Sequence, residues 1–594
     1  MLLQRIDWLI VGVYFAVSLA VGLMYSRRAG RSAVEFFAGG RNQVWWLLGV
    51  SMVATTFSTD TPNLVTDMVR QHGVSGNWLW WAFLLTGMLT VFVYARLWKR
   101  SGVLTDIEFY ELRYSGRPAA FLRGFRALYL GFFFNIIIMA SVSLAAIKIG
   151  GVLLNLTPLQ TILLACLITA AYSALSGLLG VLITDFFQFF LAMAGSVAAA
   201  LVALRLPQVG GLSGLLGNEA VRSRLALLPD FADTPALLAV LVIPLAVQWW
   251  SVWYPGAEPG GGGYIAQRML AARDARHATG AVLFFNAAHY ALRPWPWIIV
   301  ALCSLVVFPS LDSIRAAFPH AAKVGHDMGY PAMLTFLPAG LLGMVVASLI
   351  AAYMSTIATH LNWGSSYMVN DFYKRFLRRS AGDKELVLAG RMSTVILMAV
   401  AGVTALLMRN ALDSFQIMLQ VGAGTGLLFI LRWFWWRINA WSEIAAMIVS
   451  FLVAVYMRFL HRLTGLPPLS DWLQLVIGVG ITTCGWLLVT FLTRPTETGV
   501  LVSFYRKVRP GGPGWRRFLE RAGAGGEGPE GVDAAWQVPR GILCMFLGCV
   551  AVYSALFATG NWIYGRTLPA ALLTAAAAAA ALVLTKMWGR VVRD

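Results

Sequence analysis

Residues 45–69 read WWLLGVSMVATTFSTDTPNLVTDMV, an apolar segment that becomes polar near its middle and then meets a proline. Between residues 55 and 61, every position except Phe57 carries a hydroxyl or carboxyl group. Pro62 has no backbone N–H to donate and its ring crowds the preceding turn, so a helix here is expected to break or kink at residues 57–61. A break would expose backbone carbonyls, whereas a proline kink packed against neighbouring helices is the structural alternative.

The composition of the chain places this segment in a membrane. Of its 594 residues, 59% are hydrophobic and only 12% are charged, and the mean hydropathy is +0.70. A helix needs roughly 20 apolar residues to cross about 30 Å of hydrocarbon. About fifteen such segments recur, which predicts an all-α polytopic membrane protein whose first span is retained rather than removed as a signal peptide. They lie near residues 6–26, 45–69, 77–98, 125–153, 158–176, 178–204, 235–255, 278–308, 332–368, 388–408, 412–434, 440–461, 470–492, 541–558 and 566–588.

The net charge of +19 has an explanation in the same topology. Arginine and lysine gather in alternate loops, beginning with Arg27, Arg28, Arg31 and Arg41, and the positive-inside rule makes those loops cytoplasmic. We therefore expect the N-terminus outside, the C-terminus in the cytoplasm, and multi-pass insertion in the cell inner (plasma) membrane. The basic face lies beside anionic membrane lipids, and no nucleic-acid partner is expected.

A second interrupted segment follows five spans after the first. Residues 248–268 read QWWSVWYPGAEPGGGGYIAQR, in which prolines and glycines directly follow an apolar run. Interrupted spans at corresponding positions of two halves are typical of transporters built from inverted repeats. We expect five helices in residues 45–204 and five in 235–434, and because five is odd the second set is inverted across the membrane.

The remaining segments complete the expected domain organisation. The Gly- and Pro-rich runs RPGGPGW and AGAGGEGPEG indicate a flexible cytoplasmic linker. The expected parts are an N-terminal extra helix and cytoplasmic loop (1–44), an extracellular loop (205–234), two additional helices (435–492), the linker (493–537) and two C-terminal helices (538–594).

Four stretches resemble the sodium:solute symporter family, which includes the sodium/glucose cotransporters and has the leucine-transporter fold. They are SMVATTFSTDTPN (51–63), YSALSGLLGVLITDFFQFF (172–190), YIAQRMLAARDARHA (264–278) and AAYMSTIATHLNWGSSYMVNDFYKR (351–375). The resemblance implies a 5+5 inverted repeat and a secondary active symporter that imports a small organic solute with sodium by alternating access. It implies neither enzymatic activity nor an organic cofactor.

The resemblance also implies a sodium site between the first broken helix and the eighth core helix. Its ligands would be the carbonyls of Ala54, Phe57 and Ala352 and the hydroxyls of Ser355 and Thr356. All five are oxygens, which suits a hard cation. Hydroxyls that merely bond back to helix carbonyls are the alternative, and that alternative fits Ser365 and Ser366 better.

An acidic residue in the fifth core helix points to a second ion position. Asp185 resembles the family's acid at a second sodium site or ion exit path, where Ser355 and Thr359 would accompany it. Burying an ionised carboxylate in the membrane is costly unless a cation binds to it or the group remains protonated. Ala358 stands where members with the second site tend to have a hydroxyl, so one sodium is the expected stoichiometry.

Family substrates lie between the broken helices, and most of the polar contacts of sugar-transporting relatives are altered here. The expected solute is sugar-like or a related polar or planar one, and the aromatic content would suit a planar, apolar-faced or cationic solute. Interfacial anchoring is the alternative for each tryptophan, and simple packing the alternative for the histidine. The candidates are Asp60, Thr61, Trp80, Trp81, Trp249, Trp250, Tyr254, His289 and Gln420.

Two other function classes are compatible with such a scaffold. A non-transporting solute sensor or receptor could use the linker and the last helices to dock a partner. A membrane enzyme could use His289, His360 and Asp185, but these residues lack a metal-type spacing such as HExxH.

Overall fold

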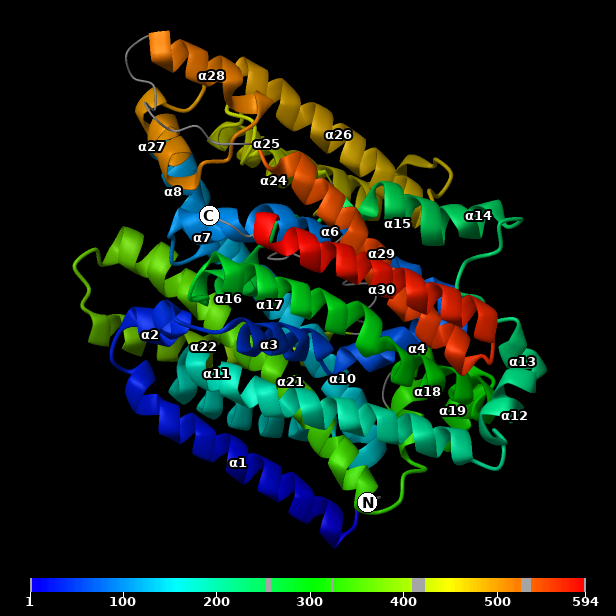
Figure 1. Ribbon diagram of the computed structural model, residues 1–594. Coiled ribbons are helices and arrows are strands. Elements are labelled where there is room, and N and C mark those ends of the chain that lie inside the picture. The colour runs from blue at the N-terminus through cyan, green and yellow to red at the C-terminus, as the bar shows by residue number, and fades with distance from the viewer. Residues whose placement is uncertain are drawn as a thin grey trace.

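The computed structural model describes residues 3–252, 258–319, 321, 324–408, 422, 424–524 and 536–591. It is a bundle of helices that run roughly side by side (Figure 1), so the predicted all-α class is confirmed. In this part of the chain, eleven helices are long and apolar enough to cross a membrane, and three shorter apolar helices accompany them. The predicted span 412–434 falls largely outside the described residues.

The first broken helix has the break that the sequence predicts. Helix α3 (Trp45–Phe57) ends one residue before Ser58, and α4 (Asp60–His72) begins after Thr59. Ser58 has φ 40° and ψ 154°, so it turns the chain out of the helix. The Thr59 hydroxyl donates to the carbonyl of Leu349, 3.1 Å away, in α21 (Leu341–Ser366). The break is therefore held against α21.

The rest of the first half forms the expected spans. The element α11 (Pro158–Arg205) is interrupted at Gly177, which has the non-helical angles φ 58° and ψ −173° and divides it into the two spans predicted at 158–176 and 178–204. A Cβ at Gly177 would lie 2.9 Å from the Cβ of Ala29, which is why a glycine fits there. The other elements are η2 (Val74–Asn77), α5 (Trp78–Trp81), α6 (Leu84–Leu89), η3 (Thr90–Tyr94), α7 (Ala95–Ser101), α9 (Gly116–Leu128), η5 (Tyr129–Phe134), α10 (Asn135–Ile149) and η6 (Gly150–Leu154).

The second half contains the second interruption. The helical run from α14 (Thr234–Leu237) ends at Trp250, and the next helix among the described residues is α16 (Gly263–Ala271). Gly260 and Gly261 have φ 88° and 92°, a conformation that favours glycine. The other elements are η7 (Leu238–Val242), α15 (Ile243–Ala246), η8 (Gln248–Trp250), α17 (Ala275–Ala287), η9 (Ala288–Leu292), α18 (Pro294–Val307), η11 (Tyr367–Leu377), α22 (Asp383–Leu407) and α24 (Thr425–Leu431).

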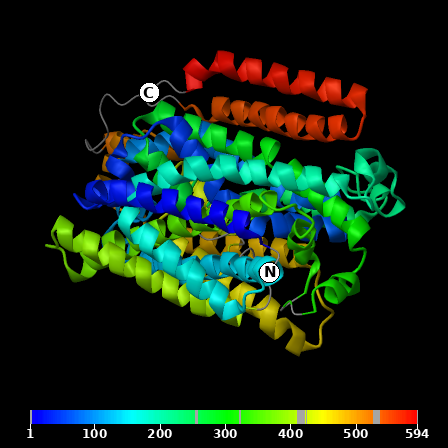
Figure 2. The same ribbon diagram turned by 90° about the horizontal axis from the view of Figure 1, so that it is seen from below.

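Further helices surround this core. Helix α1 (Arg5–Ala29) packs on α11 and α21, and α29 (Val538–Ile563) pairs with α30 (Thr567–Val591) along one side (Figure 2). Helix α1 begins and α30 ends at opposite ends of the bundle (Figure 1). The connecting and additional elements are α2 (Ala33–Ala38), η1 (Gly39–Arg41), η4 (Asp106–Glu108), α8 (Phe109–Arg113), α12 (Gly211–Gly217), α13 (Glu219–Arg222), α19 (Leu311–Ala317), η10 (His326–Met328), α20 (Gly329–Leu334), α25 (Ala440–Val455), η12 (Tyr456–Leu460), η13 (His461–Thr464) and α26 (Asp471–Leu492).

The first part of the segment that was expected to be a flexible linker is helical instead. It folds into α27 (Thr498–Val508) and α28 (Pro513–Ala524), and both pack on the bundle. Phe504 and Trp515 are fully buried, and the Trp515 indole donates to the carbonyl of Trp433 at 3.0 Å. Glycine and proline content suggested flexibility, but the apolar residues between them supply a buried face. Residues 525–535 lie outside the described part.

Candidate cation and solute site

The end of α3 meets the middle of α21 at the break in the first helix. The Thr356 hydroxyl donates to the carbonyl of Thr55 at 2.7 Å and contacts the carbonyl of Ala352 at 3.0 Å. The five residues predicted as sodium ligands are all buried, and the structure places them on these two facing segments. The hydroxyl from one helix thus already lies against a carbonyl freed by the break in the other. The five are Ala54, Phe57, Ala352, Ser355 and Thr356.

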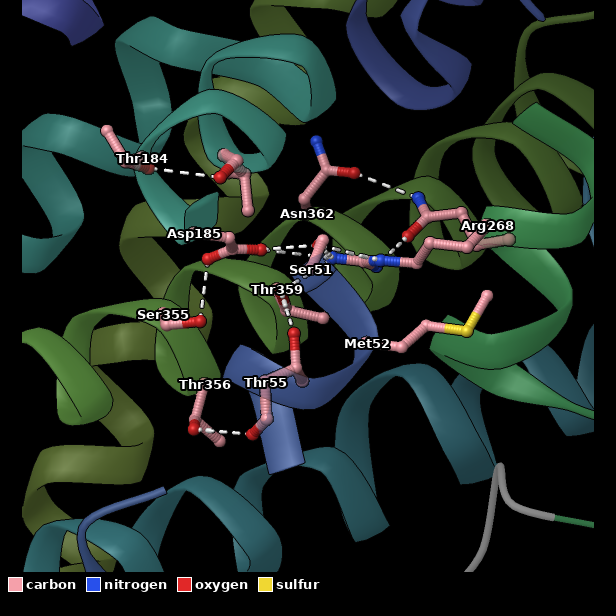
Figure 3. A network of polar contacts seen from close by, with 12 residues as sticks. Ser51, Met52, Thr55, Thr184, Asp185, Arg268, Ser355, Thr356, Thr359 and Asn362 are labelled. Atoms are coloured by element: carbon pink, nitrogen blue, oxygen red, sulfur yellow. Dashed lines mark hydrogen bonds and ion pairs between the residues drawn. The ribbon is translucent and has the colours of Figure 1, made fainter. Parts of the chain in front are cut away.

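A carboxylate from α11 lies beside this contact (Figure 3). Asp185 is fully buried and accepts hydrogen bonds from the hydroxyls of Ser51, at 2.5 Å, and Ser355, at 2.6 Å. Thr359, one turn further along α21, shares a hydrogen bond of 3.0 Å with the hydroxyl of Thr55. The residues expected around a second ion position are therefore together.

A guanidinium occupies that second position. Arg268 of α16 is fully buried, and its Nη2 donates to Thr359 at 2.8 Å and to Ser51 at 3.1 Å. The same atom lies 3.9 Å from the Asp185 carboxylate. Neither Arg268 nor Ser51 was predicted from the sequence as a site residue. The only sequence signal for Arg268 is its place shortly after an interrupted apolar segment, which does not reveal its partners.

A cavity of about 700 Å³ lies beside the first broken helix, between it, α10 and η9, and it reaches Thr356 and His360. Four predicted solute residues line it: Asp60, Thr61, Trp80 and His289. The His289 ring is 3.2 Å from the Thr56 hydroxyl, and the Trp80 ring stacks on Tyr290 with centroids 5.6 Å apart. Asn63, Tyr264 and Arg293 also line the cavity and were missed as candidates.

Three of the tryptophans predicted to contact the solute do not line this cavity. Trp81 is fully buried against Phe557 of α29, and Trp250 packs on α26. Trp249 contributes its carbonyl to the Thr86 hydroxyl. Tryptophan packs into apolar helix contacts as readily as around a solute, so the sequence alone does not separate the two roles. Tyr254 and Gln420 lie outside the described residues.

The two ends of the cavity differ. At one end it is lined by Leu311, Val324 and His326, with an ion pair between Lys148 and Asp327. This end holds α12, α13 and α19 (Figure 1). The cavity therefore extends toward the end where the positive-inside rule places the outside.

At the opposite end, charged side chains join the helices. Arg123 forms ion pairs with Glu111 at 2.7 Å, Asp371 at 2.8 Å and Glu108 at 3.2 Å. A buried ion pair joins Arg126 to Glu258, beside the second interruption. These contacts seal the bundle below the cavity.

The seal includes a loop carboxylate outside the spanning helices. Asp106 accepts hydrogen bonds from the amide of Gly263, at 2.8 Å, and from the Tyr367 hydroxyl. Burial, reinforced by the neighbouring negative charge of Glu258, raises the pKa of Asp106 to about 6. The Asp106 carboxyl therefore binds a proton more readily when this end of the bundle is closed than when the carboxyl is hydrated.

Comparisons with known proteins agree with this architecture. A profile of the sodium:solute symporter family matches residues 36–450. The chain is 25% identical over 486 residues to a sodium/glucose cotransporter of Vibrio parahaemolyticus, covering 77% of this chain and 86% of that protein. It is 28% identical over 499 residues to a sodium/mannose cotransporter of Bos taurus, covering 77% and 80%.

A solved structure shares the fold. It is the substrate-bound, outward-open state of a Na⁺-coupled sialic acid symporter, with a TM-score of 0.66 and 20% identity over 83% of this chain and 99% of that one. The predicted leucine-transporter-type fold is thus confirmed. With a family profile matched from the second helix to α25, and with the first interrupted helix meeting α21 and α11 at a cluster of oxygens, this chain belongs to the sodium:solute symporter family.

Proposed function

We propose that this chain, a sodium-coupled symporter of a small organic solute in a cellular membrane, imports one sodium ion per cycle. The ion binds between the carbonyls of Ala54 and Phe57 at the helix break and the oxygens of Ala352, Ser355 and Thr356. The observation that supports this site best is the 2.7 Å contact of the Thr356 hydroxyl with the Thr55 carbonyl. It brings a hydroxyl of α21 to within bonding distance of the opened helix end.

One sodium per cycle follows from the place of Arg268. Its guanidinium donates to Thr359 and to Ser51, and Ser51 and Ser355 in turn donate to Asp185. The hydroxyls and the carboxylate that could complete a second sodium shell are therefore already in use. A second cation would also meet the charge of the guanidinium at a short distance in a poorly screened interior. Arg268 acts as a resident cation in place of a second sodium.

The transport cycle follows from the contrast between the two ends. We place the open end of the cavity outside the cell, the sealed end and the C-terminus in the cytoplasm, and the chain in the plasma membrane. Sodium joins the broken helix to α21 and favours the state with an open outer cavity. Coupling then requires only that sodium and solute favour the same conformations, so each raises the other's affinity. The moving parts are the proposed repeats 45–204 and 235–434.

Sodium binding can be tested without knowing the solute. In detergent, NaCl should raise the melting temperature of the wild type above its value in KCl, because a ligand of the native state stabilises it. The double variant Ser355→Ala, Thr356→Ala should lose this difference.

Ser365→Ala, Ser366→Ala is the matched control, because these two hydroxyls on the same helix donate to carbonyls of their own helix, Asn362 and Trp363. The control should keep the sodium effect. A sodium effect that persists in the Ser355, Thr356 double variant would overturn the site. In proteoliposomes, solute accumulation driven by a sodium gradient tests symport itself.

A further inference from the structure

We infer that the solute is a carboxylate monoanion whose charged group is bound by Arg293. The inference rests on the proposed function and assigns the substrate class of the same cavity.

Arg293 lies directly before α18 and lines the cavity with only 1% of its surface exposed. Its Nη1 is 3.3 Å from the Thr56 hydroxyl and 3.4 Å from the Val53 carbonyl, and its Nη2 is 3.3 Å from the His289 ring. These distances are at the outer limit of hydrogen bonding. Its Nε has no acceptor among the described residues.

The other buried arginines in the described part of the chain show what this site lacks. Three have a carboxylate within 4.0 Å: Arg126, Arg268 and Arg432. Two others donate to carbonyls at helix ends. Arg70 reaches Ser304 and Phe308 at 2.7–2.8 Å, and Arg113 reaches Arg432, Trp435 and Trp436 at 3.0–3.2 Å.

Arg293 has no carboxylate within 4.0 Å among the described residues, and its one carbonyl contact, with Val53, is longer than those of Arg70 and Arg113, at 3.4 Å. Aromatic rings supply part of what is missing, since the guanidinium lies 5.2 Å from the Trp297 ring centre and 6.0 Å from that of Phe57. Asp60 also lines the cavity and attracts Arg293 through space, but the two form no ion pair within 4.0 Å. Asp60 starts α4, where helix N–H groups favour a carboxylate.

A buried charge without a partner is costly, and in a binding cavity the partner can arrive with the ligand. A carboxylate matches the fork of a guanidinium and forms short, charge-assisted hydrogen bonds. His289 fits this role as a neutral ring, because its Nε2 must accept from Arg293 while its Nδ1 faces the Thr56 hydroxyl. The same guanidinium disfavours the cationic solute that the aromatic residues alone had allowed.

The other residues that line the cavity indicate which groups the acid carries besides its carboxylate. Asn63 is 3% exposed, and neither atom of its amide has a hydrogen-bond partner among the described residues. It lines the cavity together with the aromatic side chains of Trp80 and Phe83. The cavity therefore suits an acid with a hydrogen-bonding group for Asn63 and an apolar face for the aromatic rings.

The test uses matched pairs of probes that differ in charge. Purified protein in NaCl is titrated with D-glucuronate against D-glucose, D-galacturonate against D-galactose, L-lactate against 1,2-propanediol, and benzoate against benzyl alcohol. At least one acid should bind about tenfold or more tightly than its neutral partner, because a charge-assisted pair replaces an uncompensated charge. A panel in which no acid exceeds its partner, including a panel without any binder, overturns the inference.

Variants of Arg293 sharpen the result. Arg293→Met should abolish the preference for the acid while keeping stabilisation by NaCl, and Arg293→Lys should keep part of the preference. An Arg293→Met protein that still prefers the acid would assign the anion to another residue. If this variant does not fold, the matched pairs on the wild type still decide the question.

Transport separates the inference from the proposed function. One sodium and one monoanion carry no net charge, so a membrane potential set with valinomycin should leave accumulation of the acid in proteoliposomes unchanged. If a neutral solute accumulates with sodium, the substrate class is wrong and symport stands. If an acid binds but a sodium gradient does not drive its accumulation, the proposed function fails.

Discussion

Arg268 and Arg293 are both buried arginines next to the break in the first helix, and their surroundings are opposite. Arg268 has a carboxylate at 3.9 Å and hydroxyl acceptors at 2.8 and 3.1 Å. Arg293 has only neutral acceptors, at 3.3–3.4 Å, in the described residues. The Arg268 guanidinium has its partners within the protein, whereas the proposed partner of the Arg293 guanidinium is the carboxylate of the solute. Burial alone therefore does not reveal what a charged residue in a membrane protein does.

The largest expected effect comes from removing each guanidinium in turn. Arg268→Met leaves the Asp185 carboxylate buried without its partner and should lower the free energy of unfolding by about 3–5 kcal/mol in sodium-free buffer. Arg293→Met removes a charge that has no carboxylate within 4.0 Å and only long hydrogen bonds, and should leave the solute-free protein as stable as the wild type or more so. Chemical unfolding in KCl measures both.

The Arg268→Met, Asp185→Asn double variant is the control, and it should recover much of the lost stability because no unpaired charge remains. Equal losses from Arg268→Met and Arg293→Met would remove the distinction between the two arginines. Addition of NaCl gives a further check: it should stabilise Arg268→Met more than the wild type, because the vacated position has a free carboxylate for a cation.

A smaller effect is expected from Asp185→Asn. The Ser355 hydroxyl donates to Asp185 at 2.6 Å, which leaves its lone pairs available to the proposed sodium. Loss of this charge-assisted bond should weaken sodium binding about tenfold, as measured by the NaCl dependence of the melting temperature. An unchanged dependence of the melting temperature on NaCl would mean that Asp185 pairs with Arg268 but does not support sodium binding.

The smallest effect tests the sealed end. Because the pKa of Asp106 is raised to about 6, the sealed state binds this proton more tightly than a hydrated state does. The free energy of unfolding of the wild type, relative to that of Asp106→Asn, should therefore rise by about 1 kcal/mol as the pH falls from about 7 to about 5. Melting temperatures of the two proteins across this range measure it. Parallel curves would mean that Asp106 stays equally buried in both states.

The sequence predicted the parts of the fold that depend on local chemistry. Pro62 and its polar neighbours marked the first break, and the prolines and glycines after Trp250 marked the second. The positions of the sodium ligands came from a resemblance and remain a prediction. Arg268 could not be assigned, because its partners Ser51, Asp185 and Thr359 are far from it in the sequence and only the packed bundle brings them together.

The solute residues were harder to predict for a different reason. Trp80 lines the cavity and its neighbour Trp81 does not, although both are tryptophans in one apolar segment. Which face of a helix turns inward is decided by helices such as α29 that are distant in the sequence. The helical, packed state of residues 498–524 was likewise a tertiary effect that overrode a glycine-rich composition.

Ser58 gives the break a property that a glycine would not. A serine at φ 40° is strained by roughly 1–3 kcal/mol, and a glycine would adopt this conformation without that cost. A glycine, however, would also let the two half-helices sample many relative orientations. Serine restricts them, so the open helix end keeps its carbonyls in place before the ion arrives. The two half-helices then lose their conformational entropy when the protein folds, and not each time the protein binds a sodium ion. Each binding event is therefore less costly.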